Sequence, residues 1–189
     1  MSTVYGRSLV SMVDEISSLA AGDERPDATL SNIVTLVANA FEADVCSVYL
    51  LESDRNHLVL AATVGLRQEC VGRLRMGMNE GLAGLVAERL QPVAVAQAAL
   101  HPRFKYFAAA GEDDYQSLLG VPLIDRGVLQ GVLTVQTVES RDYLAEEIDA
   151  LTAVASELAP TVSEALTLGQ FFDPSQGRLW SVANNLWWS

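Results

Sequence analysis

The sequence predicts a single α+β domain built on an antiparallel sheet. Helical periodicity occurs near both ends of the chain, and the strands between are joined mainly by short turns, which is typical of antiparallel hairpins. Half of the 189 residues are hydrophobic, which is enough for a substantial core. We therefore expect the terminal helices to cover one face of the sheet. A short helix and a long loop would cover the other face and leave a cavity.

Two amphipathic helices are expected before the first strand. Apolar residues recur at steps of three and four over residues 8–21, and Gly22 ends this helix. Pro26 and Asp27 suit the start of a second helix, because proline is favoured in the first helical turn. The apolar stripe of this second helix continues to Phe41.

The first hairpin is expected directly after these helices. Residues 45–51 are rich in β-branched and aromatic side chains, which is typical of a buried strand. Turn-forming residues follow at 53–56, and residues 58–64 are predicted to return as the second strand. Residues 71–76 are predicted to form a short third strand.

The second hairpin is expected at residues 117–124 and 128–138, with its turn at 125–127. Pro122 cannot donate a ladder hydrogen bond, so we expect an edge position or a bulge there. A further short strand is predicted at residues 92–95.

A glycine-rich stretch at residues 77–88 is predicted to lead into a short helix, with Asn79 as its N-cap. Its spacing matches neither the dinucleotide-binding fingerprint nor the P-loop. We therefore interpret these glycines as allowing the helix to pack closely on the sheet, rather than as binding phosphate.

The last predicted helix follows Asp142, its expected N-cap, and carries an apolar seam at alternating steps of four and three. Such a seam favours either packing on the sheet or pairing with a second helix. We expect both, with the partner contact beyond a kink at Pro160. Residues 1–168 are assigned to the domain, and residues 169–189 to an aromatic-rich tail that contains all three tryptophans.

The loop at residues 101–115 is the most informative segment. It combines Arg103 and Lys105 with several aromatic side chains and an acidic run. A long loop within a compact domain usually lines a site or is disordered. Its aromatic residues argue against disorder, because such side chains gain by burial. We therefore predict that this segment forms the wall or lid of a pocket.

The net charge of −12 argues against partners with negatively charged backbones or surfaces. We expect no binding to nucleic acid or to membranes. The two cysteines, Cys46 and Cys70, provide neither a disulfide framework nor a metal site, and no cofactor is predicted. The sequence shows no signal-peptide pattern and no long apolar run, so we expect a cytoplasmic location.

Four motifs carry a resemblance to a known family. They are residues 45–51, Gly77-x-x-Glu80-Gly81-Leu82-x-Gly84-Leu85-Val86, His101-Pro102-Arg103-Phe104, and Leu119-Gly120-Val121-Pro122-Leu123 followed by residues 131–136. Over about residues 8–168 the chain resembles a GAF domain. It is most similar to the amino-terminal GAF domain of nitrogen-branch phosphotransferase-system Enzyme I, a phosphoenolpyruvate-protein phosphotransferase. The resemblance implies a PAS-like fold with a six-stranded antiparallel sheet, a sensory pocket, and dimers formed through terminal helices.

The resemblance also implies a regulatory role, in which the pocket controls a phosphotransferase or a similar signalling output in nitrogen regulation. The 189 residues lack the downstream region that carries the active-site histidine of such enzymes, so no phosphotransfer by this chain is expected. Free methionine sulfoxide reductases are GAF domains that use several cysteines on pocket loops. Only Cys70 has a loop-like position here, which makes this activity a remote alternative. No catalytic residue is predicted.

The expected ligand is a small polar metabolite of the amino acid or 2-oxo acid type. Arginine can hold a carboxylate through two hydrogen bonds, so Arg103 is the expected anchor. Strand alternation places Ser47 with Tyr49, and Thr134 with Gln136, on one face each, and we predict that both pairs face the pocket. The predicted ligand contacts are Ser47, Tyr49, Arg103, Phe104, Tyr106, Tyr115, Ser117, Leu119, Thr134 and Gln136.

The alternative hypothesis is an interaction module without a ligand. The chain would then act as a homodimer joined through its terminal helices, and Phe104 and Tyr106 would fill the pocket.

Overall fold

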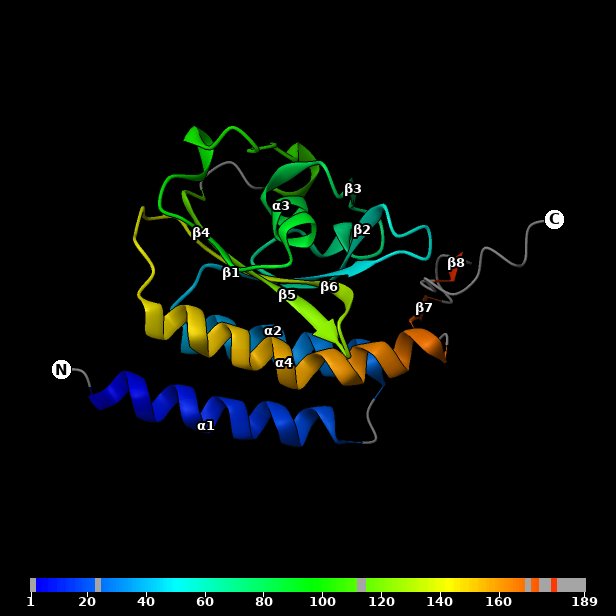
Figure 1. The fold of residues 1–189 in the computed structure, drawn as a ribbon, viewed down its shortest axis with the longest axis horizontal. Helices are drawn as coiled ribbons and strands as arrows, with labels where there is room; N and C mark the ends of the chain where they lie inside the picture. The colour runs from blue at the N-terminus through cyan, green and yellow to red at the C-terminus, as the bar shows by residue number, and fades with distance from the viewer. Residues whose placement is uncertain (1–2, 23–24, 112–114, 169–170, 174–177, 180–189) are drawn as a thin grey trace.

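The structure is a computed structural model that describes residues 3–22, 25–111, 115–168, 171–173 and 178–179. Four α-helices and a six-stranded antiparallel sheet make up most of the described part of the domain (Figure 1). The helices are α1 (Thr3–Ala20), α2 (Pro26–Ala40), α3 (Gly81–Arg89) and α4 (Ala145–Thr167). The strands of the sheet are β1 (Val45–Leu51), β2 (His57–Val64), β3 (Arg75–Gly77), β4 (Val93–Val95), β5 (Ser117–Asp125) and β6 (Val128–Thr137).

The sheet has the strand order β3-β2-β1-β6-β5-β4, and all neighbouring strands are antiparallel. Every residue of the central strand β1 is buried, because both faces of the sheet are covered. Helices α1, α2 and α4 lie on one side of the sheet, and α3 lies on the other (Figure 1). The predicted fold class is confirmed, including the placement of the terminal helices on one face.

Pro122 lies beyond the part of β5 that pairs with β4, which ends at Gly120. The β5–β6 register also shifts between Leu123 and Ile124. Both features agree with the edge or bulge expected at this proline.

The apolar seam of α4 is buried inside the domain. Its residues, including Leu151, Leu158 and Val162, belong to the core between the sheet and helices α1, α2 and α4. Helix α1 lies outermost and packs on both α2 and α4, with Ile16 fully buried. Because the seam is already covered beyond Pro160 as well, it is not available for the predicted partner contact, and core packing accounts for it.

Several element boundaries differ from those expected. Strand β3 is short because residues 68–70 form a 3₁₀ turn, after which the N–H of Leu74 donates to the carbonyl of Cys70 at 2.8 Å. Helix α3 begins after Glu80 rather than Asn79. Helix α4 begins after Leu144 rather than Asp142. There the Glu147 carboxylate accepts the N–H of Leu144 at 2.9 Å.

The predicted aromatic-rich tail, residues 169–189, lies largely outside the described residues. Its described part contains one short antiparallel pair, β7 (Phe172–Asp173) with β8 (Arg178–Leu179). Phe171, just before this pair, is buried against the helix-covered core.

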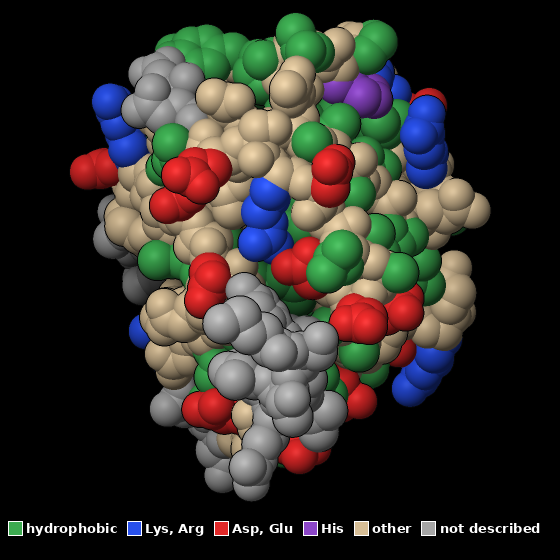
Figure 2. Space-filling model, turned by 90° about the vertical axis from the view of Figure 1, so that its left-hand side faces the viewer, with side chains coloured by type: hydrophobic (Ala, Val, Ile, Leu, Met, Phe, Trp, Pro, Cys, Tyr) green, Lys and Arg blue, Asp and Glu red, His purple; other side chains and the backbone are tan. Residues whose placement is uncertain are grey.

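Acidic side chains are spread over the face shown in Figure 2, where basic side chains stand apart from one another. The described residues of this face therefore offer no large cluster of positive charge to a polyanion. Among the described residues, no helix combines the length and the apolar character needed to cross a membrane.

Candidate functional site

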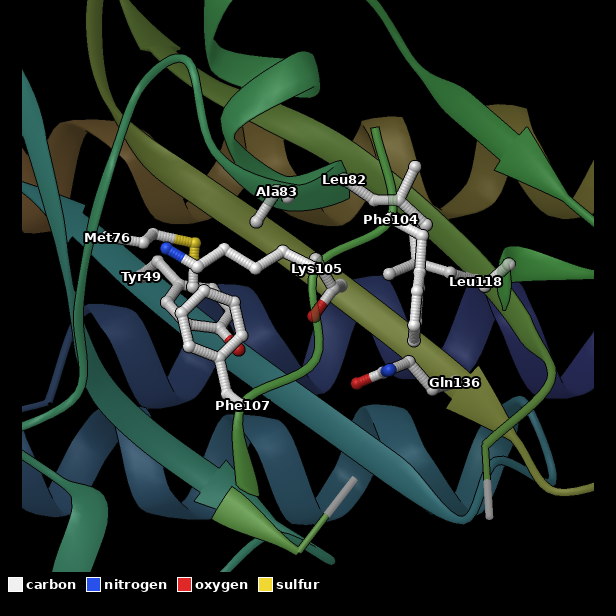
Figure 3. Close-up of a pocket in the computed structure, with 12 residues that line it drawn as sticks. Tyr49, Met76, Leu82, Ala83, Phe104, Lys105, Phe107, Leu118 and Gln136 are labelled. Carbon is white, nitrogen blue, oxygen red and sulfur yellow. The ribbon is translucent and has the colours of Figure 1, made fainter. Parts of the chain in front are cut away.

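A small pocket lies between the sheet, helix α3 and the loop segment formed by residues 103–107, called the lid here (Figure 3). Its volume is about 30 Å³. A buried water needs roughly 10–15 Å³ on this scale, so the space holds about two water molecules. The predicted hollow beneath the loop is therefore present, but it is narrow.

The floor of the pocket consists of Tyr49 from β1 and of Thr134 and Gln136 from β6. Successive side chains of a strand point to opposite faces, and these three residues lie on the face that lines the pocket, as the strand alternation predicts. The amide of Gln136 points between the rings of Phe104 and Phe107 (Figure 3).

Thr134 is the most unusual floor residue. It is only 1% exposed, and its hydroxyl oxygen is buried without a hydrogen-bond partner among the described residues. Leaving such a group unpaired costs about 1–3 kcal/mol. Thr134 lines the pocket, so a polar ligand group that reached its hydroxyl would remove this cost.

The lid covers the floor with one charged and two aromatic side chains, Lys105, Phe104 and Phe107 (Figure 3). The Lys105 ammonium lies 5.2 Å from the centre of the Phe107 ring and 2.6 Å from a carboxylate oxygen of Glu80. The lid also packs on the first residue of α3, Gly81.

Arg103, the expected carboxylate anchor, does not line the pocket. Its guanidinium donates to Glu88 at 2.7 Å and to the carbonyl of Met78 at 3.1 Å. These bonds tie the lid to α3 and to the turn before it. Arg103 therefore holds the lid in place, and Lys105 is the cation that reaches the pocket.

Two predicted contacts from β5 lie on the wrong face. Ser117 bonds to Thr137 and, at 2.8 Å, to the hydroxyl of Tyr143, which packs on the helix-covered core. Leu119 is fully buried in that same core. The pocket residue of this strand is Leu118, so the candidate site excludes Ser117 and Leu119.

Three other predicted contacts, Ser47, Tyr106 and Tyr115, are not among the residues that line the pocket. Ser47 is on the pocket side of β1, but its hydroxyl shares a 2.8 Å hydrogen bond with Thr63. Tyr106 is 44% exposed. The Tyr115 hydroxyl donates to the carbonyl of Gly65 at 3.1 Å. The lining residues missing from the predicted set include Met76, Leu82, Ala83, Lys105, Phe107 and Leu118.

A comparison with protein-family models identifies the fold. The model of the GAF domain matches residues 25–162, which is most of the chain. The chain belongs to the GAF domain family. The resemblance expected from the four sequence motifs is therefore confirmed.

Curated relatives of this GAF domain are much longer proteins. A "Phosphoenolpyruvate-dependent phosphotransferase system" protein of Salmonella typhimurium is 34% identical over 171 residues, which covers 90% of this chain and 23% of the relative. A "Nif-specific regulatory protein" of Azospirillum lipoferum is 29% identical over 154 residues, covering 78% of this chain and 24% of the relative. The chain thus spans about a quarter of the length of these relatives.

Solved structures support the same assignment. The GAF domain from a phosphoenolpyruvate-protein phosphotransferase of Coxiella burnetii has a TM-score of 0.81 and 34% identity, covering 86% of this chain and 97% of that one. The free methionine-R-sulfoxide reductase of Neisseria meningitidis has a TM-score of 0.71 at 23% identity, over 85% of this chain and 91% of that one. At that identity the second similarity shows the shared fold alone.

The cysteines of this GAF domain lie on opposite faces of its sheet. Cys46 is in the helix-covered core, and Cys70 is on the pocket side, where its thiol donates to the carbonyl of Ala109 at 3.1 Å. A thiol cycle requires an attacking and a resolving sulfur close together, which this separation prevents. The arrangement gives no support to the reductase alternative.

Burial raises the pKa of the Cys46 thiol far above its ordinary value. The thiolate is the reactive form, so Cys46 should stay protonated and inert in the folded domain. In the Cys70→Ser variant at pH 8, iodoacetamide should leave Cys46 unmodified for hours, whereas the same protein in guanidinium chloride should be alkylated within minutes. Rapid labelling of the folded protein would contradict this placement of Cys46.

Among the described residues, one group of side chains lies close enough together to share a metal ion, namely Glu52, Asp54 and His57. Arg75 binds both carboxylates, at 2.7 Å and 3.2 Å. The guanidinium therefore already supplies the positive charge that a cation would bring, and we interpret the group as a surface ion-pair network.

Proposed function

We propose that this chain is a regulatory sensor domain that binds a small polar metabolite in the pocket beneath the lid. The ligand is of the amino acid or 2-oxo acid type, and binding controls a phosphotransferase or a similar signalling output. The observation that carries this proposal is the hydroxyl of Thr134, which is buried and has no hydrogen-bond partner among the described residues. Such a group lowers the stability of the fold, so its presence calls for an explanation, and ligand binding provides one.

The neighbours of Thr134 support a ligand rather than a structural role. Gln136 offers both a donor and an acceptor, and Lys105 adds a positive charge at the edge of the same space. Apolar walls with a few converging polar groups are typical of small-molecule sites. Because the present volume is only about 30 Å³, an entering metabolite must displace the lid.

The relatives support the regulatory part of the proposal. This GAF domain is similar to part of a phosphotransferase-system protein and to part of a Nif-specific regulatory protein. The two names describe group transfer in one relative and regulation in the other, with no common substrate. A sensory domain that can be combined with different outputs would explain why both relatives contain a similar segment.

Isothermal titration calorimetry with a panel of amino acids and 2-oxo acids tests the proposal. At least one compound should bind at or below millimolar concentration. The Gln136→Met variant should weaken that binding about tenfold, because one buried hydrogen-bonding group contributes roughly 1.4 kcal/mol. Gln130→Met is the matched control, since Gln130 is on the same strand but does not line the pocket and should bind normally. Absence of binding by every compound to the folded domain would end the proposal.

A second candidate function is self-association through helices α1 and α2. An open groove of about 610 Å³ lies between these helices, and its apolar residues include Met12, Leu19 and Leu36. The seam of α4 is used within the chain, so pairing would rely on this groove instead. Light scattering at micromolar concentration should then show a dimer that Leu36→Asp dissociates. A monomer under these conditions would rule out this function.

A further inference from the structure

Lys105 differs from the other basic residues of the chain in type and in position. It is the only lysine among the 189 residues, and every other basic side chain apart from histidine is arginine. It is also the one charged side chain among the described residues that line the pocket. The Lys105 side chain is 43% exposed, so it lies at the boundary between the pocket and solvent.

Glu80 holds this ammonium in the structure. One oxygen of its carboxylate lies 2.6 Å from Nζ of Lys105, and the other accepts the N–H of Gly77 at 2.9 Å. These two donors hold the pKa of Glu80 below its usual range, so the carboxylate is negatively charged at neutral pH. Glu80 is therefore a carboxylate of the protein itself, bound to the one cation of the pocket.

The bond between Glu80 and Lys105 is easy to exchange. Ion pairs with exposed partners contribute little to stability, because water competes for both charges. If Lys105 moved to another anion, Glu80 would keep its bond to Gly77 and its position just before the first residue of α3. A negative charge there is favoured by the helix dipole, so Glu80 would remain satisfied without its lysine partner.

The polar groups at the two ends of the pocket differ in charge. Thr134 and Gln136 on the floor are uncharged, and the hydroxyl of Thr134 has an unused hydrogen-bonding capacity among the described residues. Lys105 on the lid is cationic. A compact monoanion that also carries a neutral polar group would satisfy all three residues.

We propose that Lys105 is the anion-recognition residue of the pocket and that Glu80 is its internal competitor, which a ligand carboxylate displaces. This inference rests on the proposed sensing function and adds the charge and orientation of the ligand. Displacement removes the ion pair between the lid and Glu80, while Arg103 still ties the lid to Glu88 and Met78, so ligand binding loosens the lid at Lys105. Glu80 also raises the ligand concentration needed for binding, because it lowers the affinity of the pocket for every anion that binds Lys105.

Straight-chain 2-oxo acids of three to six carbons, each compared with its uncharged 2-oxo amide, provide the probes. Calorimetry on the 189-residue protein should show tighter binding of the acid than of the amide. The Glu80→Gln variant should bind the acids about tenfold more tightly, because its amide keeps the bond to Gly77 and does not compete as an anion. Lys105→Gln should lose the preference for acids, and Lys105→Arg should retain it.

The matched control is Glu52→Gln, which removes another surface ion pair of 2.7 Å without touching the pocket. It should leave both affinities unchanged. Equal binding of acids and amides to the wild-type protein, or unchanged acid affinity in Glu80→Gln, would overturn this inference while leaving the sensing proposal standing. If neither acids nor amides bind to any variant, this inference fails, and the sensing proposal fails with it only if the amino acids of the first panel do not bind either.

Discussion

Replacing Gly131 with alanine should destabilise this GAF domain by about 3 kcal/mol or more, an effect large enough to unfold it at moderate temperature. Gly131 lies in β6 opposite Leu50 of β1, at the centre of the sheet. A Cβ atom added at this position would lie 2.1 Å from the carbonyl oxygen of Tyr49. That oxygen belongs to the backbone of a fully buried strand, so it cannot move aside without disturbing the β1–β6 ladder.

Urea unfolding followed by circular dichroism measures this effect, and Gly127→Ala is the matched control. Gly127 has a φ of 78° in the turn between β5 and β6, and nothing lies within 4 Å of an added Cβ atom. Alanine there should cost only about 1 kcal/mol, from backbone strain. If Gly131→Ala were no worse than Gly127→Ala, the close approach of β6 to β1 would be incorrect.

Replacing Thr134 with valine should stabilise the domain and weaken ligand binding at least tenfold. Valine has nearly the shape of threonine and removes the buried hydroxyl that has no partner among the described residues. The free energy of unfolding should therefore rise by about 1 kcal/mol. The ligand would lose a hydrogen bond at the floor of the pocket. A gain in stability together with a loss of affinity would indicate that Thr134 serves ligand binding at a cost in stability.

The matched control is Thr137→Val on the same strand. The Thr137 hydroxyl is also buried, but it bonds to Ser117 and to the carbonyl of Glu139. Its removal leaves those groups short of a partner, so this variant should lose about 1–2 kcal/mol of stability. Chemical unfolding and calorimetry on both variants give the comparison. A destabilised Thr134→Val variant with unchanged affinity would show that its hydroxyl serves the fold.

Strand periodicity was enough to orient the floor of the candidate site. In β1 and β6 polar residues interrupt otherwise apolar strands at alternate positions, such as Tyr49 in β1 and Thr134 and Gln136 in β6. Polar side chains are costly beneath packed helices, so this alternation indicated the pocket face. The structure places all three residues on the pocket floor.

Strand β5 could not be oriented in the same way. Both of its faces are covered, and residues 118–123 are all apolar, so no alternation distinguishes Leu118 from Leu119. Ser117, at the start of β5, was the polar residue used to orient this strand, and its hydroxyl is satisfied on the helix side by Thr137 and Tyr143. The Tyr143 contact joins residues 26 positions apart, which no local pattern reveals.

The roles of Arg103 and Lys105 were also beyond the sequence. Both residues lie in an irregular segment, where side-chain direction follows no fixed period. Arg103 turns to α3 because Glu88 and the carbonyl of Met78 are within reach. The α4 seam was ambiguous for a different reason, because a heptad pattern is the same whether the helix packs on its own sheet or on a partner.

The central claim is that ligand binds between the lid and the pocket face of the sheet. Methyl NMR of the domain during titration with a metabolite identified by calorimetry tests it most directly. The methyl resonances of Thr134 and Leu118 should shift together, and those of Leu119 and Val135 on the opposite face should stay in place. Shifts confined to Met12 and Leu36 in the α1–α2 groove would contradict the claim.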